Sequence, residues 1–401
     1  YFATNCLSPL SGTAPSWQQL KQAVDRLDSS GLYEGIRLRQ DSRSAATTLI
    51  VELESASAAS NVFGLKMAYT STYSPTAAIS KRIFGFDVLF EDIGGRGNQL
   101  AVMGQLIDVP GIGVKYARRL WPQVTLDTRA NFSRAFDAYL TADSLGYRYQ
   151  STTIDAGLGL GFEPILAHKL HLDWDYTLIK ESYIPESYAD ATIDRASMIR
   201  SGFSVNKLDS SIFPMDGILS DAEYALSLPQ LGSGQYFSTF TWRGGVYTSL
   251  KSPISLGFVW KAGTDFSARA GSATSAPYYY KPSLNERSLF PGPIPSEGYI
   301  GSHVSAAGII ATASLARLSR AITVPTFLTI QSSAGAVLRD LSDYAGLRAF
   351  DRWNWTNAIG VGIRVNEGLG ISLKGGVAKN AGSSAEPFFS FDFGAISPQL
   401  E

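Results

Sequence analysis

The stretch LHLDWDYTL, residues 170–178, decides the fold class of this chain. Leucine and aromatic side chains occupy its even positions, and His, Asp and Thr stand between them. Because successive side chains of a β-strand point to opposite faces, this segment forms a strand with one bulky apolar face and one polar face. Two-residue alternation therefore organises this part of the sequence.

The same alternation recurs along most of the chain after about residue 61. It is clear at 63–70, 153–162, 254–261, 359–366 and 389–394. The polar face is rich in small residues, as Gly157, Gly159 and Gly161 illustrate. A chain of this kind is predicted to be all-β, with many short strands of similar pattern.

Two architectures give such alternation. In a soluble sandwich or small barrel the apolar face points inward, and in a transmembrane barrel it meets lipid while the polar face lines the lumen. About 340 residues of two-residue pattern would make an oversized soluble β domain. The small-residue polar faces suit a crowded lumen. Aromatic residues at segment ends, as in an interfacial girdle, also favour the membrane barrel; they are Tyr69, Tyr73, Trp121, Tyr236 and Trp355.

At roughly 20–24 residues per strand and turn, the chain accommodates about sixteen antiparallel strands. We place their starts near residues 62, 83, 98, 110, 122, 152, 168, 196, 219, 235, 254, 302, 324, 355, 369 and 387. Short connections such as Glu367–Gly368 and Asp108–Pro110 contrast with the long segments 134–151, 180–195 and 267–301. We expect short turns at one rim and long loops at the other, with the Pro- and aromatic-rich segment 267–301 packed as an ordered loop.

Residues 1–56 have a different pattern. Helical spacing follows Ser16, with Leu20 and Val24 among the apolar positions, and two alternating segments follow at 33–40 and 47–54. This predicts a small α+β module before a barrel domain at residues 57–401. The chain begins at Tyr1 without a visible signal peptide, so we expect a trimmed piece of a longer protein.

Composition excludes several functions. The net charge is −1, which argues against a nucleic-acid-binding footprint, and charged residues make up only 17%. The single cysteine, Cys6, permits no internal disulfide and no cysteine-based metal site. No Gly-x-Ser-x-Gly elbow is present, so we expect no enzyme and no cofactor here, and a hydrolase of that type would have to lie upstream.

Charged residues are also expected on the lumen face. Asp173 and Asp175 share one strand face with His171, whereas His168 faces the opposite side. We interpret the two aspartates as part of a hydrated lumen patch rather than a catalytic pair. Their expected partners are cations on other strands: Lys115, Arg129, Arg200 and Arg364.

Four segments resemble the bacterial surface-antigen superfamily of outer-membrane barrels, which includes the BamA, TamA and patatin-fused branches. They are Leu20–Glu54, similar to the end of a POTRA domain; Phe90–Gly97; Leu208–Gly217; and Pro325–Gly335 together with Phe389–Gly394. The resemblance implies a barrel in the bacterial outer membrane with a POTRA remnant in the periplasm. It also implies contact with outer-membrane lipids, with client or passenger proteins, and with accessory periplasmic proteins through the POTRA remnant.

The long loop departs from the pattern of the family's insertases, which usually carry an Arg-Gly-aromatic tip and an Asp in the strand behind it. This sequence has Ser332 and Ser333, followed by Gly335, in that strand. We therefore expect the ion pair between loop and strand to be absent, which favours a divergent branch such as the patatin-fused one. The corresponding loop residues are Arg287, Ser288, Leu289, Phe290, Pro291 and Gly292.

The seam between the first and last barrel strands is the leading candidate site. The resemblance implies a weak seam that serves as a lateral gate, and an ordinary closed seam is the alternative. We expect Gly64 and Ser390 to lie on the lumen face, close enough for paired cysteines to lock the seam. The predicted seam residues are Phe63, Gly64, Leu65, Met67, Phe389, Phe391, Phe393 and Gly394.

Three functions follow from these observations. The barrel assists insertion or translocation of proteins at the outer membrane, or it anchors and exports an N-terminal patatin-like phospholipase passenger, or it is a porin-like channel. The POTRA-like segment argues against the channel. The sequence leaves the oligomeric state open.

Overall fold

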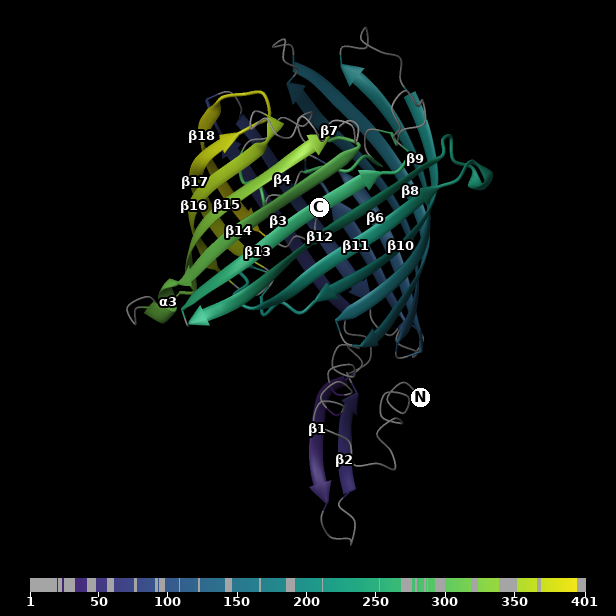
Figure 1. The fold of residues 1–401 in the computed structure, drawn as a ribbon. Helices are drawn as coiled ribbons and strands as arrows, with labels where there is room; N and C mark the ends of the chain where they lie inside the picture. The colour runs from purple at the N-terminus through teal and green to yellow at the C-terminus, as the bar shows by residue number, and fades with distance from the viewer. Residues whose placement is uncertain are drawn as a thin grey trace.

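The computed structural model is a closed barrel of sixteen antiparallel strands, β3 to β18 (Figure 1). Apart from gaps of one or two residues, it describes residues 33–41, 48–55, 61–90, 98–140, 146–184, 192–267, 300–318, 324–338, 352–365 and 369–394. It also describes Leu20, Val24, Ile93 and parts of 276–292. The predicted fold class, an all-β transmembrane-type barrel of about sixteen strands, is confirmed.

The strands follow one another around the barrel in chain order. The first eight are β3 (Asn61–Tyr73), β4 (Ala78–Phe90), β5 (Gln99–Gln105), β6 (Gly111–Trp121), β7 (Val124–Leu140), β8 (Gly146–Ile165), β9 (His168–Ile184) and β10 (Thr192–Asn206). The remaining eight are β11 (Gly217–Ser227), β12 (Phe237–Lys251), β13 (Ile254–Asp265), β14 (His303–Ser314), β15 (Thr326–Leu338), β16 (Asn354–Arg364), β17 (Gly370–Lys379) and β18 (Ala385–Gly394). Two short helical elements connect strands, η3 (Pro229–Leu231) and α3 (Leu315–Leu318).

The apolar faces of the strands point away from the barrel centre, as the alternation predicts. Phe63, Leu172 and Trp174 keep 64%, 52% and 42% of their surface exposed, whereas Asp175 and Ser390 on the other face are buried. A soluble barrel would show the reverse, because its apolar face would fill the interior. The outward apolar band is therefore the lipid-facing surface of a membrane barrel.

The two rims differ, but less simply than the sequence suggests. The lower rim is the one where β3 begins, and the upper rim is the other. At the lower rim, β6–β7, β8–β9 and β12–β13 follow each other almost directly, but 207–216 and the α3 segment make longer connections. The expectation of short turns at one rim and long loops at the other is therefore wrong for these two connections.

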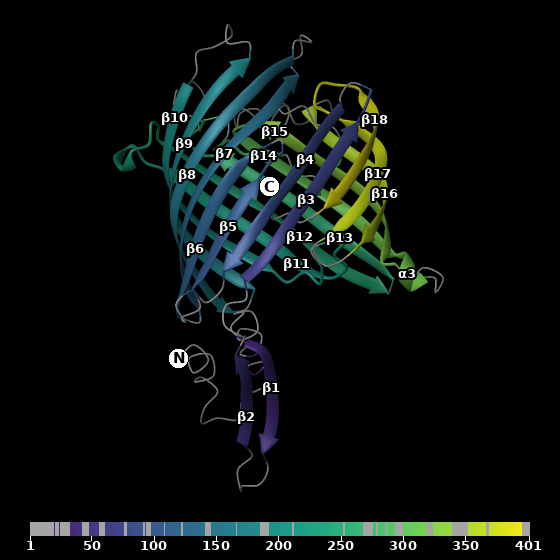
Figure 2. The same cartoon turned by 180° about the vertical axis from the view of Figure 1, so that it is seen from behind.

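Two of the three long loops predicted at the upper rim are largely strand. β7 and β8 pair up to Leu140 opposite Gly146, and β9 and β10 pair up to Glu181 opposite Thr192. These strands rise on the side of the barrel away from β16–β18 (Figure 2). Main-chain pairing therefore continues beyond the strands that the sequence predicts.

The N-terminal module contributes a hairpin below the lower rim, formed by β1 (Tyr33–Asp41) and β2 (Thr48–Ser55) (Figure 1). Both strands were predicted. Of the helix expected before them, only Leu20 and Val24 lie among the described residues, and both are helical. In the part of the chain that the structure describes, no helix combines the length and apolar character needed to cross a membrane.

Candidate functional site at the barrel seam and the lumen loop

The barrel closes where its last strand, β18, pairs with its first strand, β3. The register runs only from Phe389 opposite Tyr73 to Phe393 opposite Tyr69, which is five residue pairs. On its other edge, β3 pairs with β4 along its whole length from Asn61. The two edges of β3 are therefore unequal: one is fully paired, and the other is paired only near the upper rim.

The lower half of β3, residues 61–68, has no partner strand on the β18 side among the described residues. Its outer face carries Phe63, Leu65 and Met67, each at least half exposed. In hydrocarbon, an unpaired backbone amide or carbonyl has no water to replace the missing strand, so it costs several kcal/mol. This half-strand is an edge that another β-strand can complete.

Local backbone chemistry limits the seam at both ends of β18. Pro387 near its start has no N–H to donate, and the register with β3 begins two residues later at Phe389. At its end, Gly394 has a φ of 121°, and a Cβ there would overlap the backbone of Met67 and Ala68. Only glycine allows this close approach, so β18 ends against the middle of β3.

The structure places the predicted seam residues in two groups. Phe389, Phe391 and Phe393 lie in the paired segment, and the Phe391 ring lies 5.9 Å from that of Tyr69. Gly394 ends β18, opposite Gly370 of β17. The remaining four lie below the paired segment, on the unpartnered lower half of β3: Phe63, Gly64, Leu65 and Met67.

The expected proximity of Gly64 and Ser390 across the seam is wrong. Ser390 lies opposite Thr72, and Gly64 lies opposite Asp87 of β4. Alternation shows which face a residue occupies, but barrel strands close with a stagger that alternation does not reveal. Thr72 and Ser390, both buried on the inner face, are the pair that faces across the seam.

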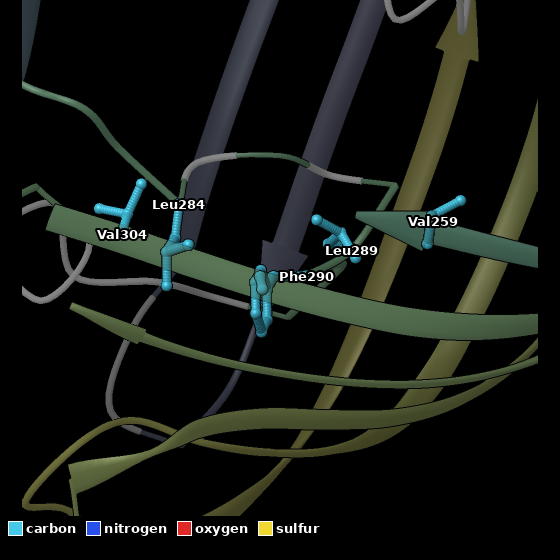
Figure 3. Close-up of a cluster of buried hydrophobic side chains, with 6 residues drawn as sticks. Val259, Leu284, Leu289, Phe290 and Val304 are labelled. Atoms are coloured by element: carbon cyan, nitrogen blue, oxygen red, sulfur yellow. The ribbon is translucent and has the colours of Figure 1, made fainter. Parts of the chain in front are cut away.

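The long loop between β13 and β14 turns back into the lumen. Leu284, Leu289 and Phe290 are almost completely buried, and they pack on inward side chains of β13 and β14 (Figure 3). The strand residues of this cluster are Val259, Val304 and Ala306. The prediction of an ordered, packed loop holds for its described residues, and an apolar cluster inside a polar lumen fixes the loop against one wall.

Polar contacts hold the same loop segment to the wall. Gln331 of β15 donates through Nε2 to the carbonyl of Leu289 at 2.8 Å, and also to that of Ser288. The buried Glu286 places Oε2 3.4 Å from Lys261 Nζ and 3.8 Å from Arg243 Nη1. Because both kinds of contact are shielded from water, they position the loop more firmly than surface pairs would.

The predicted absence of the family's Arg–Asp pair between loop and strand stays a prediction, because Arg287 lies outside the described residues. A different ion pair joins the loop to the wall, with the acid, Glu286, on the loop and the cations on β12 and β13. These residues are far apart in the sequence, so no local spacing marks the pair.

The residues predicted in the strand behind the loop face different ways. Ser333 and Gly335 are buried on the inner face of β15, and Ser332 is exposed on the outer face. A Cβ at Gly335 would come within 3.1 Å of the Phe290 ring, so this glycine makes room for the loop. Gln331, which the sequence analysis did not single out, makes the hydrogen bonds instead.

The loop also reaches the wall beside the seam. A Cβ at Gly292 would come within 2.8 Å of Ala378 Cβ and 3.4 Å of the Phe388 ring. Phe388 of β18 is buried with Ala358 and Ala378 in a small cluster. The loop therefore spans from the β13–β15 wall to the inner face of the last strand.

The opposite wall of the lumen carries a network of charges. Asp175 of β9 lies between Arg129 of β7 and Arg200 of β10, with Arg200 Nε 3.3 Å from its Oδ2. His171 Nε2 lies 3.8 Å from Glu223 and 3.9 Å from Asp173. The prediction of a mixed-charge lumen patch is borne out by these contacts.

The other two cations expected in that patch lie elsewhere. Lys115 lines a recess of about 340 Å³ toward the lower rim, together with Arg119, Lys169 and Asp127. Arg364 instead places its guanidinium 5.4 Å from the Phe327 ring centroid. Within the described ranges, no cluster of three or more His, Cys, Asp or Glu side chains is arranged to hold a metal ion.

Comparison with known proteins agrees with this architecture. Residues 92–281 match the Omp85 superfamily domain. The fold is similar to that of BamA from Haemophilus ducreyi lacking POTRA domains 1–3, with a TM-score of 0.64 and 15% identity, covering 94% of this chain and 78% of that one. No curated protein matches the sequence.

Two further solved structures show the same barrel. CdiB from Escherichia coli has a TM-score of 0.64 and 10% identity, with 98% of this chain and 73% of that chain covered. CdiB from Acinetobacter baumannii has a TM-score of 0.61 and 9% identity, with coverages of 98% and 71%. At these identities the likeness establishes the fold.

Proposed function

The chain carries an Omp85 superfamily domain within a BamA-like barrel, and from this premise we propose that it assists the insertion or translocation of proteins at the bacterial outer membrane. The single observation that carries the proposal is the seam, where β18 covers only the upper part of β3. An incompletely paired edge inside a membrane is unfavourable when left alone and is stabilised by any strand that joins it.

The mechanism is strand templating rather than covalent chemistry. An incoming strand pairs with the edge of β3 at residues 61–68, supplying the backbone donors and acceptors that the described part of β18 does not reach. Outward residues Phe63, Leu65 and Met67 then lie beside the apolar side chains of the client. Separation of the five pairs between β3 and β18 then lengthens the available edge, and the assembly of a whole client barrel requires this separation.

The lumen loop acts as a support for the seam in this proposal. Gln331 and the ion pairs of Glu286 fix the loop on the β13–β15 wall, and Gly292 then lies against Phe388 of β18. Loop position and seam position are therefore joined through direct packing. This assigns the predicted loop residues a positioning role.

The partners follow from the geometry. Outer-membrane lipids cover the apolar outer band, and client proteins meet the seam. We assign residues 1–56 to a POTRA-like module on the periplasmic side, because β1 and β2 lie beyond the lower rim (Figure 1). A patatin-like passenger upstream of Tyr1 and a porin-like channel stay predictions of the sequence, and no feature of the described residues favours them.

Site-specific photo-crosslinking tests the templating step. A photoreactive phenylalanine analogue replaces Leu65 on the free edge of β3, and in a control variant it replaces Leu172 on β9. Both side chains are lipid-facing, with 63% and 52% of their surface exposed, but β9 is paired on both edges. An unfolded eight-stranded outer-membrane barrel is added to proteoliposomes containing either variant.

The proposal predicts covalent adducts with the added barrel at position 65 and almost none at position 172. Adducts should disappear when the client is folded beforehand, because its strands are then already paired. Equal crosslinking at both positions would indicate nonspecific contact with lipid-facing surface and would contradict templating at the seam.

A further inference from the structure

The connection between β10 and β11 is longer than the lower rim requires. Neighbouring strands at this rim need only the turns after Trp121, Ile165 and Lys251. The segment 207–216, described apart from Ser211, instead leaves the wall and reaches strands β15 and β16. Because β12, β13 and β14 lie between, the segment crosses beneath part of the lumen rather than following the rim.

The tip of this segment is a phenylalanine seated in a socket. The Phe213 ring stacks on that of Phe327 of β15, with centroids 4.9 Å apart and an interplanar angle of 18°. The tip of the Phe213 ring points at Gly362 of β16, which pairs with Phe327, and any Cβ at Gly362 would overlap the ring. Arg364 places its guanidinium near the Phe327 ring and so borders the socket. The missing side chain at Gly362 is what makes room for the ring.

The base of the segment is rigid. Asp209 accepts hydrogen bonds through Oδ1 from the backbone N–H of Met215 at 2.9 Å and of Asp216 at 3.1 Å. Ser249 of β12 donates to the Met215 carbonyl at 3.3 Å. Ile212 and Met215 are buried, so apolar side chains accompany Phe213 into the interior.

The backbone at the tip is strained. Phe213 has a φ of 53°, in the left-handed region, which a bulky side chain seldom adopts. Strain of this kind persists only where surrounding contacts offset it, and it concentrates in elements that have two states. The ring stack and the Gly362 socket are the contacts that hold Phe213 in this conformation.

One wall carries both this segment and the lumen loop. Phe327, Thr329 and Gln331 follow one another on the buried inner face of β15. Phe327 holds Phe213, and Gln331 holds the loop carbonyls. Thr329 lies between these two contacts on the same face. Segment 207–216 therefore covers the inner face of β15 below Thr329, and the lumen loop covers it above.

We propose that residues 207–216 form a latch that closes the lower end of the lumen. The Phe213 ring holds the latch shut by binding in a socket formed by Gly362, Phe327 and Arg364. When Phe213 leaves the socket, its backbone relaxes and the inner face of β15 becomes open from the lower rim. The latch is independent of the proposed seam function, since it would equally control a barrel that served only as a channel.

Thiol accessibility at position 329 tests the latch. Thr329→Cys is introduced in a Cys6→Ser background, which leaves one thiol in the chain. A charged, membrane-impermeant methanethiosulfonate reagent is added to the purified, folded protein. Phe213→Ala should raise the labelling rate at position 329 by about tenfold, because local opening governs access to a buried thiol.

Two variants control the result. Phe266→Ala removes an exposed phenylalanine at the upper rim and should leave the rate unchanged. Gly362→Val fills the socket and should raise the rate as Phe213→Ala does, with no further increase in the double variant, because both changes break one interaction.

Heat-modifiable electrophoretic mobility establishes that each variant is folded. If Gly362→Val fails to fold, the comparison of the labelling rates of Phe213→Ala and Phe266→Ala is sufficient. Unchanged labelling in the folded Phe213→Ala variant would overturn the latch, and additive effects in the double variant would overturn the assigned socket.

Discussion

The joint between β7 and β8 and the joint between β18 and β3 are made of the same antiparallel pairing, yet they differ greatly in extent. The first runs through seventeen residue pairs, from Val124 opposite Phe162 to Leu140 opposite Gly146. The second has five. The joint between β4 and β5 is also short, with six pairs. Because backbone groups inside the membrane have no water to bond, the wall from β7 to β9 is held far more extensively than the region around the seam.

Polar side chains reinforce the long joint, whereas an aromatic contact between Tyr69 and Phe391 spans the seam. Asn131 of β7 donates to Asp155 of β8 at 2.8 Å, and Arg129 reaches across Gly157 to Asp175. At the seam, Pro387 and Gly394 limit pairing at either end of β18. We therefore expect the seam to open more readily than the joint between β7 and β8.

The largest effect is expected from breaking the charge network of the strong wall. Asp175→Ala leaves Arg129 and Arg200 without their shared carboxylate and should lower the free energy of unfolding by about 3 kcal/mol. Urea titration followed by heat-modifiable mobility measures this. Asp221→Ala, which removes the more exposed partner of Arg243, should cost less than about 1 kcal/mol. Equal losses would show that the buried network does not strengthen this wall.

A smaller effect is expected at the loop. Gln331→Ala leaves the carbonyls of Ser288 and Leu289 without a donor and should destabilise the docked loop by about 1–3 kcal/mol. Limited proteolysis should then cut the loop faster. Ser332→Ala, on the outer face of the same strand, should have no effect. If both variants resisted proteolysis like the parent protein, the apolar cluster alone would account for docking.

The ion pair between the loop and the wall is tested by removing its charges. Glu286→Gln should loosen the loop by about 1–2 kcal/mol, because Lys261 then loses its carboxylate partner in a shielded site. Adding Lys261→Met to Glu286→Gln should restore part of the loss, as no buried cation is left unpaired. The same proteolysis assay reads both variants, and a double variant worse than either single one would argue against this pairing.

The most local effect is expected at the end of the seam. Gly394→Ala places a side chain at a φ of 121° and against Met67 and Ala68, which should shift β18 at a cost of about 1–3 kcal/mol confined to that strand. Hydrogen–deuterium exchange should quicken at Tyr69–Tyr73 and stay unchanged in β7 and β8. Uniform quickening through the barrel would show that the seam does not open on its own.

The strands and their faces were predictable because alternation is local. The start of β9 at His168 and of β13 at Ile254 coincides with the prediction, and the outward direction of Leu172 and Trp174 follows from the two-residue period alone. The largest misplacements are at β4, β8 and β10, which begin at Ala78, Gly146 and Thr192. There, strands continue by pairing where the pattern has faded.

The site was predictable only in outline. That the first and last strands meet follows from barrel closure, but the opposition of Ser390 and Thr72 depends on the stagger of all sixteen strands. The contacts of Glu286 and Gln331 join positions far apart in the sequence, and no local spacing marks them. Phe213 lay in a segment noted only for its resemblance, and nothing in its sequence pattern indicates its socket.

Locking the seam shows whether clients need the joint between β18 and β3 to open. Thr72→Cys with Ser390→Cys, in a Cys6→Ser background, joins residues that lie opposite each other across the seam. Gly64→Cys with Ser390→Cys is the matched control, because position 64 is about 27 Å along β3 from position 72 and should not crosslink. Assembly of an unfolded eight-stranded barrel into proteoliposomes is measured before and after oxidation, and after reduction.

Oxidation should stop assembly in the Thr72–Ser390 variant, and reduction should restore it. Assembly by the control variant should not change. Undiminished assembly by a fully crosslinked seam would contradict the claim that clients enter through the joint between β18 and β3.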